Sequence, residues 1–230
     1  MKIRHLYLIV LGFAIADLAT SQTDLEYQTP PQEITNLVEA PQTPAVSVNP
    51  EGTWMVLMAR PGYPSIEEVA QPELRLAGLR INPRTNGPSR SRSYNGLSFK
   101  NVLNGREVEI TGLPEEPQIE NVSWSPDGEK IAFTINKPDG IELWMASVSD
   151  GEAIKLTDAV INDVMGWRPY RWLDEGKSIL YKAIPDERGE KPKEPVTPVG
   201  PVIQESTGEK APVRTYQDLL ENKYDEALFD

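Results

Sequence analysis

A turn-and-strand motif occurs three times in this chain and constrains its fold more than any other feature. The copies read VSVNPEGTWMVLM, VSWSPDGEKIAFT and YRWLDEGKSILYK, and their glycines, Gly52, Gly128 and Gly176, align. Each copy predicts two strands joined by a tight turn, because proline presets a turn torsion and glycine readily adopts a positive φ. In the third copy, Asp174 replaces the proline. Three matching copies indicate a repeated structural unit.

The positions around the aligned glycines carry matching apolar residues. Side chains alternate along a strand, so the third and fifth residues after each glycine share one face of the sheet. Four residues before the glycine, the second and third copies have Trp124 and Trp172, which we expect to be core residues because aromatic side chains dominate such burial. A binding platform is the alternative for these tryptophans. The residues assigned to the structural repeat are Pro50, Gly52, Trp124, Pro126, Asp127, Gly128, Trp172 and Gly176.

Further strands follow the first two copies. After the second copy, residues 142–148 predict a third strand, and a short fourth strand ends at Thr157. After the first copy, residues 73–81 take the place of a third strand, followed by a long polar loop at 82–96. The aligned glycines are 76 and 48 residues apart, and the second spacing matches a propeller blade of about 40–50 residues. We therefore predict an all-β fold, an incomplete β-propeller of about three four-stranded blades. A β-sandwich is the rival fold, but it does not predict this repeat.

The first 21 residues have the layout of a secretory signal peptide. Lys2 and Arg4 precede an apolar run from Leu6 to Ala16, and small residues allow cleavage after Ser21. The apolar run is shorter than the about 20 residues that span a bilayer. We expect a periplasmic or secreted protein that has no contact with the membrane after cleavage. The remaining residues, 22–230, would form the N-terminal part of the propeller domain.

Several kinds of chemistry are missing from the sequence. The net charge of −12 argues against nucleic acid as a partner. The chain has no cysteine, and its one histidine, His5, lies in the predicted signal peptide. A Ser–His–Asp triad, a Cys–His pair and a typical zinc site therefore cannot form in the mature chain. The sequence also lacks G-x-S-x-G and phosphate-loop motifs. We expect no catalytic residue, metal or cofactor here.

Longer stretches of the sequence resemble a known family. The stretches YQTPPQEI, ELRLAGLRINPRTNGPSRS, PDERGEKPKEPVTPVGPVIQE and VRTYQDLLENKYDEALFD, together with the repeated motif, run over nearly the whole mature chain. In these stretches the chain resembles serine peptidases of the prolyl oligopeptidase family, and within it the glutamyl endopeptidase-like subfamily. The segments AGLRINPRTNGPSR and RTYQDLLENKYDEALFD are the most specific.

The resemblance implies a function and its partners. Such peptidases have an N-terminal propeller covering a C-terminal α/β-hydrolase domain that holds the catalytic triad. The chain would then be the non-catalytic propeller part of a peptidase that cuts after glutamate. Its partners would be peptide substrates and the hydrolase domain, which this sequence does not include. The propeller would gate substrate access. A stand-alone binding propeller of the periplasm is the alternative.

Arginines gather between residues 75 and 92 of this acidic chain. The resemblance implies acidic substrates, and a guanidinium group binds a carboxylate through two hydrogen bonds. A solvated loop that balances nearby acidic residues is the alternative. The candidate substrate-binding residues are Arg80, Arg84, Arg90 and Arg92.

The C-terminal third of the chain contains a second predicted loop. Residues 185–214 are rich in proline, glutamate and lysine, which predicts a long loop. Residues 216–228 have apolar side chains at helical spacing and predict a short helix.

Overall fold

The computed structural model of the chain describes residues 28–166, 168–197, 200, 208 and 216–230. The predicted signal peptide, Trp167 and much of the predicted loop at 185–214 lie outside the described residues. The chain divides into two units, residues 1–40 and 41–230. In the first unit, the described part contains helix α2 (Gln32–Val38), which buries no residue. The second unit contains all the strands.

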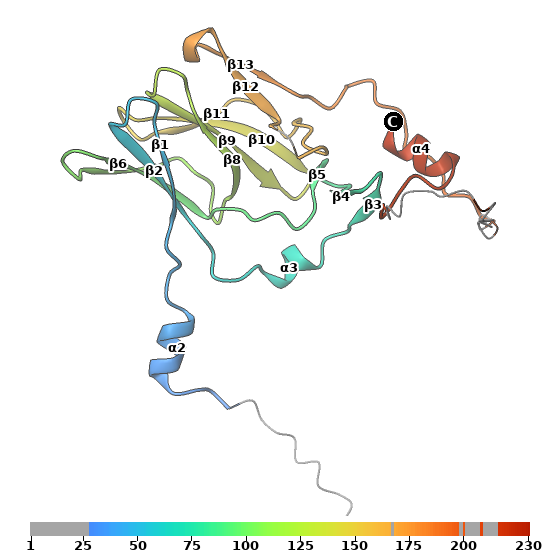
Figure 1. The fold of residues 1–230 in the computed structure, drawn as a ribbon, viewed down its shortest axis with the longest axis horizontal. Helices are drawn as coiled ribbons and strands as arrows, with labels where there is room; N and C mark the ends of the chain where they lie inside the picture. The colour runs from blue at the N-terminus through green and yellow to red at the C-terminus, as the bar shows by residue number, and fades with distance from the viewer. Residues whose placement is uncertain (1–27, 167, 198–199, 201–207, 209–215) are drawn as a thin grey trace, which may run out of the picture. The chain divides into compact units, whose positions relative to one another are not determined.

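The second unit is built from four antiparallel sheets, as Figure 1 shows. Sheet 1 has the order β1-β2-β6-β7, and sheet 2 the order β11-β10-β9-β8. Sheet 3 is the pair β12-β13, and the insertion sheet has the order β3-β4-β5. None of them closes on itself. The described chain is therefore mainly β, as predicted. The strands are β1 (Ala45–Val48), β2 (Trp54–Ala59), β3 (Leu74–Leu76), β4 (Leu79–Asn82), β5 (Gly87–Pro88), β6 (Gly96–Asn101), β7 (Glu107–Glu109), β8 (Gln118–Trp124), β9 (Lys130–Lys137), β10 (Gly140–Ser147), β11 (Ala153–Lys155), β12 (Tyr170–Leu173) and β13 (Ser178–Tyr181).

Three short helical segments complete the second unit. Helix α3 (Ile66–Val69) begins after Ser65, whose side chain accepts a hydrogen bond from the backbone of Glu68. The 3-10 turn η2 (Asp174–Gly176) joins β12 to β13. Helix α4 (Lys223–Phe229) covers only the second half of the helix predicted near the C-terminus. Among the described residues, no helix is long and apolar enough to cross a membrane.

The three copies of the repeated motif form three hairpins. Each pairs the two predicted strands: β1 with β2, β8 with β9, and β12 with β13. Gly52, Gly128 and Gly176 lie in the turns with φ of 70°, 69° and 91°. The residue four before each glycine faces the residue three after it: Val48 opposite Met55, Trp124 opposite Ile131, and Trp172 opposite Ile179. The three predicted hairpins therefore form, and they share one register.

Sheets 1 and 2 pack face to face through one hydrophobic cluster. Sheet 1 contributes Val56 and Phe99, which are fully buried, and sheet 2 contributes Ile131 and Phe133. Trp124 lies between the sheets with its ring 5.6 Å from that of Phe99. Its indole Nε1 donates a hydrogen bond of 3.2 Å to the backbone oxygen of Ser47 on β1.

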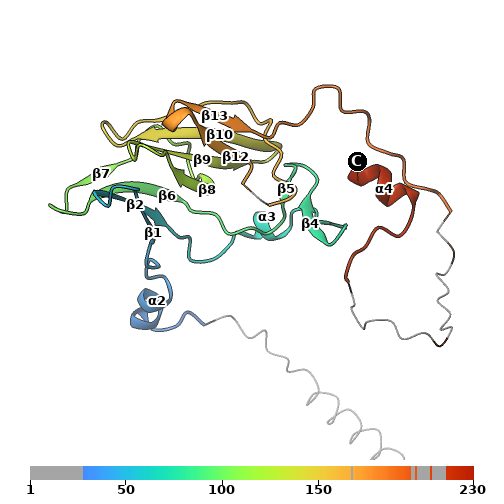
Figure 2. The ribbon, with the colours of Figure 1, turned by 45° about the horizontal axis from the view of Figure 1, so that its top comes forward.

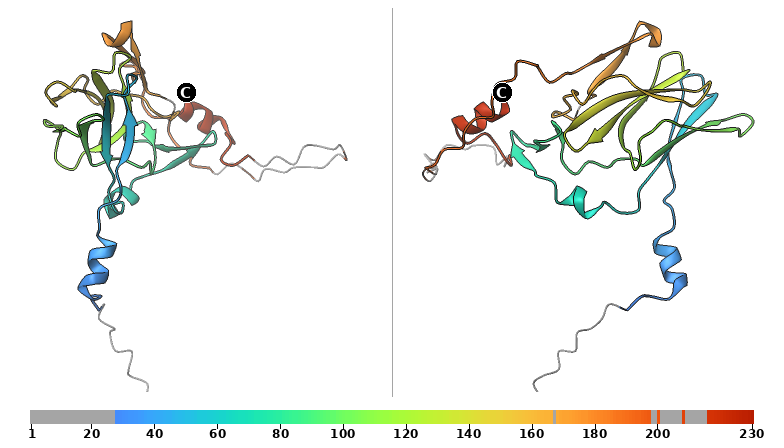
Figure 3. Two further views of the ribbon diagram at one scale, coloured as in Figure 1. Left: turned by 60° about the vertical axis from the view of Figure 1, so that its left-hand side comes forward. Right: turned by 180° about the vertical axis from the view of Figure 1, so that it is seen from behind.

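Sheets 2 and 3 pack in the same way through a second cluster. Sheet 2 now contributes its opposite face, with Ala132 and Leu143, while sheet 3 contributes Tyr170, Trp172 and Ile179. Because Ala132 occupies the repeat position of Val56, and Ile179 that of Ile131, the two interfaces use equivalent faces of successive sheets. Figure 2 shows β12 and β13 on the side of sheet 2 away from β1 and β2, and the two views in Figure 3 agree. Trp124 and Trp172 are thus core residues between sheets.

The prediction for the third strand of sheet 1 was wrong. Residues 73–81 do not join sheet 1 but contribute β3 and β4 to the insertion sheet. The turn between these strands is Ala77-Gly78, where both residues have positive φ, as a two-residue hairpin turn requires. The third strand of sheet 1 is β6, which pairs with β2. The predicted loop at 82–96 therefore contains strand residues at both ends and β5 within it.

Candidate functional site: an arginine-lined pocket

A long excursion between two neighbouring strands of sheet 1 carries the arginines. It leaves the sheet after Ala59 and returns at Gly96, and these two residues face each other in the ladder between β2 and β6. The excursion contains α3 and the insertion sheet. Both ends of the excursion are therefore fixed by the same strand pair.

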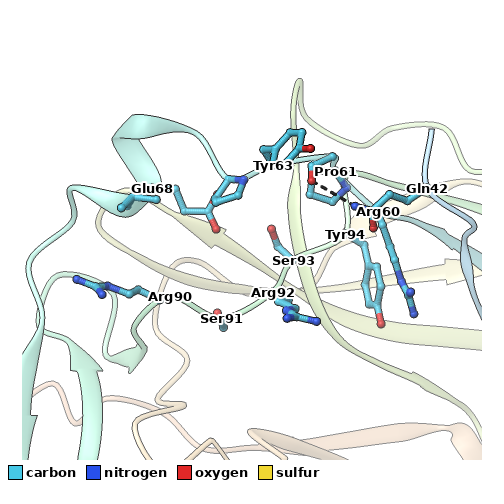
Figure 4. A pocket seen from close by; sticks show the side chains of 13 residues that line it. Gln42, Arg60, Pro61, Tyr63, Glu68, Arg90, Ser91, Arg92, Ser93 and Tyr94 are labelled. Atoms are coloured by element: carbon cyan, nitrogen blue, oxygen red, sulfur yellow. Dashed lines mark hydrogen bonds between the residues drawn. The ribbon is translucent and has the colours of Figure 1, made fainter. Parts of the chain in front are cut away.

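A pocket of about 620 Å³ opens beside this excursion. Three arginines line it, Arg60, Arg90 and Arg92, and Glu68 is the one acidic residue in the lining. Tyr63 and Tyr94 add aromatic surface. Figure 4 shows Arg90, Ser91 and Arg92 in succession along one wall, with Arg60 beside Tyr94. The pocket thus has three guanidinium groups for one carboxylate.

Backbone and side-chain hydrogen bonds fix the walls of the pocket. Tyr94 and Ile119 of β8 exchange two backbone hydrogen bonds of 2.8 and 2.9 Å. The Ser91 hydroxyl donates to the Glu120 carboxylate, also on β8. On the opposite side, Gln42 donates to the backbone oxygen of Gly62 at 3.2 Å. The segment that carries Arg90 and Arg92 is therefore anchored to sheet 2 at two points.

The four predicted substrate-binding arginines do not gather at one place. Arg80 lies 3.3 Å from the Glu73 carboxylate and 3.0 Å from that of Asp218, and it does not line the pocket. Arg84 lines a second pocket of about 490 Å³. Arg90 lines both pockets and approaches Glu73 to 3.5 Å. Arg92 lines only the first.

Glu73 explains why Arg80 is held away from the pocket. Its carboxylate binds Arg75, Arg80 and Arg90, and it accepts a hydrogen bond of 2.7 Å from Ser89. The Ser89 hydrogen bond and the nearby guanidinium groups hold the pKa of Glu73 below its ordinary value. For Arg80, the alternative of a loop arginine balancing nearby acids describes the geometry better than substrate binding.

Arg60 is the pocket residue that the sequence did not reveal. It directly follows β2 and lies 15 residues before the arginine-rich segment, so composition alone did not connect the two. The return of the chain beside β2, which places Tyr94 in the same lining as Arg60, brings them together.

A partly buried carboxyl group lies behind the arginine segment. Glu120 accepts hydrogen bonds from Ser91 and, at 2.7 Å, from Asn136, and it lines the second pocket. Burial raises its pKa to about 7, the negative charge of Asp163 adds to the rise, and the two hydrogen bonds oppose it. Glu120 therefore changes charge near neutral pH.

Asp163 is the second buried acid of this region. It accepts a hydrogen bond of 2.9 Å from Asn121, while its Oδ1 has no hydrogen-bond partner among the described residues. Burial raises its pKa, and Asn121 and the charge of Lys182 oppose this. The sequence contained no sign that Glu120 and Asp163 influence each other, because 43 residues separate them.

The described residues contain no histidine and no cysteine side chain. No group of three or more His, Cys, Asp or Glu side chains among them could hold a metal ion. The arrangement can bind an anion through guanidinium groups, but it provides no imidazole or thiol. The guanidinium groups of the pocket can bind a negatively charged ligand.

Comparisons with known proteins place the chain beside two plant proteins. It is 36% identical over 217 residues to a protein of Arabidopsis thaliana and 34% identical over 224 residues to one of rice, Oryza sativa subsp. japonica. Both are named "Probable glutamyl endopeptidase, chloroplastic". The matches cover 89% and 91% of this chain. The chain spans only 22% and 24% of the lengths of these two relatives.

Two other comparisons add little. No protein-family model matches the sequence. Among solved structures, a 6-phosphogluconolactonase-like protein of Bacteroides fragilis matches 61% of this chain and 47% of its own, with 13% identity and a TM-score of 0.29. A similarity of that size supports no conclusion about fold or function.

Proposed function

We propose that this chain is the N-terminal, non-catalytic propeller part of an exported serine-type peptidase of the prolyl oligopeptidase family. The observation that carries the proposal is the identity of 34–36%, over about nine tenths of the chain, to two proteins named as glutamyl endopeptidases. The peptidase would cut after glutamate, and its catalytic residues would lie in a hydrolase domain outside this sequence. The N-terminal 21 residues would direct export.

The packing of the sheets supports the propeller part of this proposal. Successive sheets present equivalent faces to each other, as blades do around a propeller axis. Sheet 1 also keeps an apolar outer face, where Val46 and Val48 are about half exposed. A further blade in the complete protein would cover it. The complete propeller would then gate the access of peptides to the hydrolase domain.

The gene itself provides the first test. We expect the reading frame to continue past codon 230 and to encode G-x-S-x-G, followed by an aspartate and a histidine. A stop codon at that point would overturn the proposal in favour of a stand-alone binding propeller.

Gating requires a second test on the complete protein. Hydrolysis of a short Glu-containing fluorogenic peptide would be compared with hydrolysis of an unfolded protein of 100 residues or so, before and after deletion of the propeller. We expect the intact protein to prefer the short peptide and the isolated hydrolase domain to lose that preference. An unchanged preference would refute gating while leaving the peptidase assignment intact.

A further inference from the structure

We propose that the pocket lined by Arg60, Arg90 and Arg92 is a docking site for a peptide segment that carries at least two carboxylates next to a bulky apolar side chain. The inference rests on the proposed function only for its biological setting, because binding to the pocket can be measured on this chain alone.

The charge of the pocket is the first argument. The chain as a whole has a net charge of −12, yet this lining has three arginines and one glutamate. Arg60 and Arg92 form no ion pair with any described residue. Arg90 lies 3.5 Å from the Glu73 carboxylate, which also binds Arg75 and Arg80. Two guanidinium groups are therefore open to a ligand, and a third is weakly held. Each of them matches the geometry of a carboxylate.

The number of guanidinium groups indicates a ligand with more than one carboxylate. One guanidinium group is sufficient to bind one glutamate carboxylate, through two parallel hydrogen bonds. Three guanidinium groups around a volume of about 620 Å³ exceed what a single side chain can use, and this volume lies in the range of pockets that bind drug-sized ligands. A short acidic segment fits this donor set better than one carboxylate does.

Exposed apolar side chains at the rim supply the second requirement. Tyr63 and Val69 line the pocket with exposures of 75% and 50%, and Ile66, on the same short helix as Val69, is 89% exposed. Large apolar side chains gathered on a surface mark interaction sites more often than single ones do. A ligand that places an apolar side chain here would remove this surface from water.

The rigidity of the pocket wall favours binding. Ser91 donates to Glu120 and Tyr94 pairs with Ile119, so the arginine segment is tied to β8 on both sides of Arg92. Less conformational entropy is lost on binding when the donors are already positioned.

Direct binding to the 230-residue chain tests the proposal. The probe is a dye-labelled hexapeptide, Glu-Leu-Glu-Phe-Glu-Gly, followed by fluorescence anisotropy at low and physiological salt. We expect the double variant Arg60→Ala/Arg92→Ala to weaken binding about tenfold or more, since charge-assisted hydrogen bonds are lost. Glu68→Gln should strengthen binding, because it removes the one negative charge of the lining.

The matched control is Arg106→Ala. Arg106 is equally exposed and forms no ion pair with a described residue, but it lies between β6 and β7, outside the pocket. It removes one positive charge, as each of the two substitutions in the double variant does, and binding should change less than twofold. An equal loss for Arg106→Ala and the double variant would overturn the proposal, because general electrostatics would then explain the binding.

Two changes in the probe separate the remaining outcomes. The peptide with glutamine at every glutamate should bind at least about tenfold more weakly, and the peptide with serine for leucine and phenylalanine should also lose affinity. Tighter binding of a labelled single-stranded oligonucleotide would refute the peptide ligand. No binding of any peptide would refute the docking site, whereas the peptidase assignment depends on the gene and is unaffected by this result.

Discussion

The indole Nε1 of Trp172 donates a hydrogen bond of 3.2 Å to the hydroxyl oxygen of Ser123. Ser123 precedes Gly128 by five residues, as Ser47 precedes Gly52, and Ser47 accepts the corresponding hydrogen bond from Trp124. A hydrogen bond between equivalent residues thus joins sheet 1 to sheet 2 and sheet 2 to sheet 3, with a backbone oxygen as acceptor in the first case and a hydroxyl in the second. The tryptophan four residues before the turn glycine contacts the previous copy of the repeat. The repeat therefore encodes the packing between sheets as well as each hairpin.

Removal of the indole hydrogen bond should destabilise the second unit measurably. Trp124→Phe retains the aromatic ring but loses the donor to Ser47, and we expect a loss of about 1 kcal/mol in the free energy of unfolding. Trp124→Ala also creates a cavity beside Phe99 and should cost about 3 kcal/mol or more. Urea unfolding followed by circular dichroism measures both. Trp54→Phe is the control, because the Trp54 indole has no hydrogen-bond partner among the described residues.

The turn glycines should differ in their tolerance of alanine. A Cβ at Gly128 would lie 2.9 Å from the Asn49 side chain and 3.0 Å from that of Glu51, whereas a Cβ at Gly52 would meet nothing within 4 Å. Both glycines have positive φ, so both substitutions carry a backbone cost of about 1–2 kcal/mol. We expect Gly128→Ala to cost at least about 1 kcal/mol more. Equal losses in thermal unfolding would show that the hairpin turns do not touch.

Glu120 should make the stability of the chain depend on pH near neutrality. Its pKa rises from 4.5 to about 7 on folding. Between pH 4.5 and about 7 the carboxyl group is therefore protonated in the folded state and ionised in the unfolded state. Stability is therefore highest below pH 4.5 with respect to this group and falls as the pH rises to about 7. The full difference is about 3 kcal/mol.

The variant Glu120→Gln isolates this effect from other titrating groups, such as Asp163. Glutamine keeps the size of the side chain and its acceptor for Ser91, but it has no proton to release. The difference in unfolding free energy between the variant and the original chain should grow from pH 5 to pH 8. A constant difference over that range would contradict the raised pKa of Glu120.

The outer face of sheet 1 should promote self-association of this chain. Val46 and Val48 are 54% and 51% exposed and lie directly opposite Leu57 and Met55, which makes a continuous apolar patch. We expect sedimentation velocity to show association that increases with concentration. Val46→Thr/Val48→Thr should reduce it, whereas Val102→Thr, at an exposed loop position, should not. Equal behaviour of the two variants would exclude this face as the cause.

Much of the β-sheet scaffold could be predicted from the sequence because its information is local. The alignment of Gly52, Gly128 and Gly176 gives the turns, and strand alternation gives the faces that pack. The strand at 73–81 was misplaced because Ala77 adopts a positive φ, which alanine rarely does. That turn folds the segment back on itself, whereas a continuous strand would have reached sheet 1.

The candidate site was only partly predictable because it depends on contacts between distant segments. Arg90 and Arg92 were selected through their clustering in the sequence, and both line the first pocket. Arg60 joins this site through the return of the chain beside β2, and Glu120 is bonded to one of its lining residues, Ser91. At Asn121, a positive φ and a shift in register between β8 and β9 place the side chain beside Asp163. No periodic pattern in the sequence encodes such an irregularity.

The pairing of Ala59 with Gly96 has a consequence for how this protein can evolve. Residues 60–95, which include the three arginines of the pocket, leave sheet 1 after Ala59 and return to it at Gly96. A turn of about two to five residues could close the same hairpin, so the excursion could be replaced without changing the strands that it joins. Its length and charge can change from one protein to another, and with them the ligand, while the stacked sheets stay as they are.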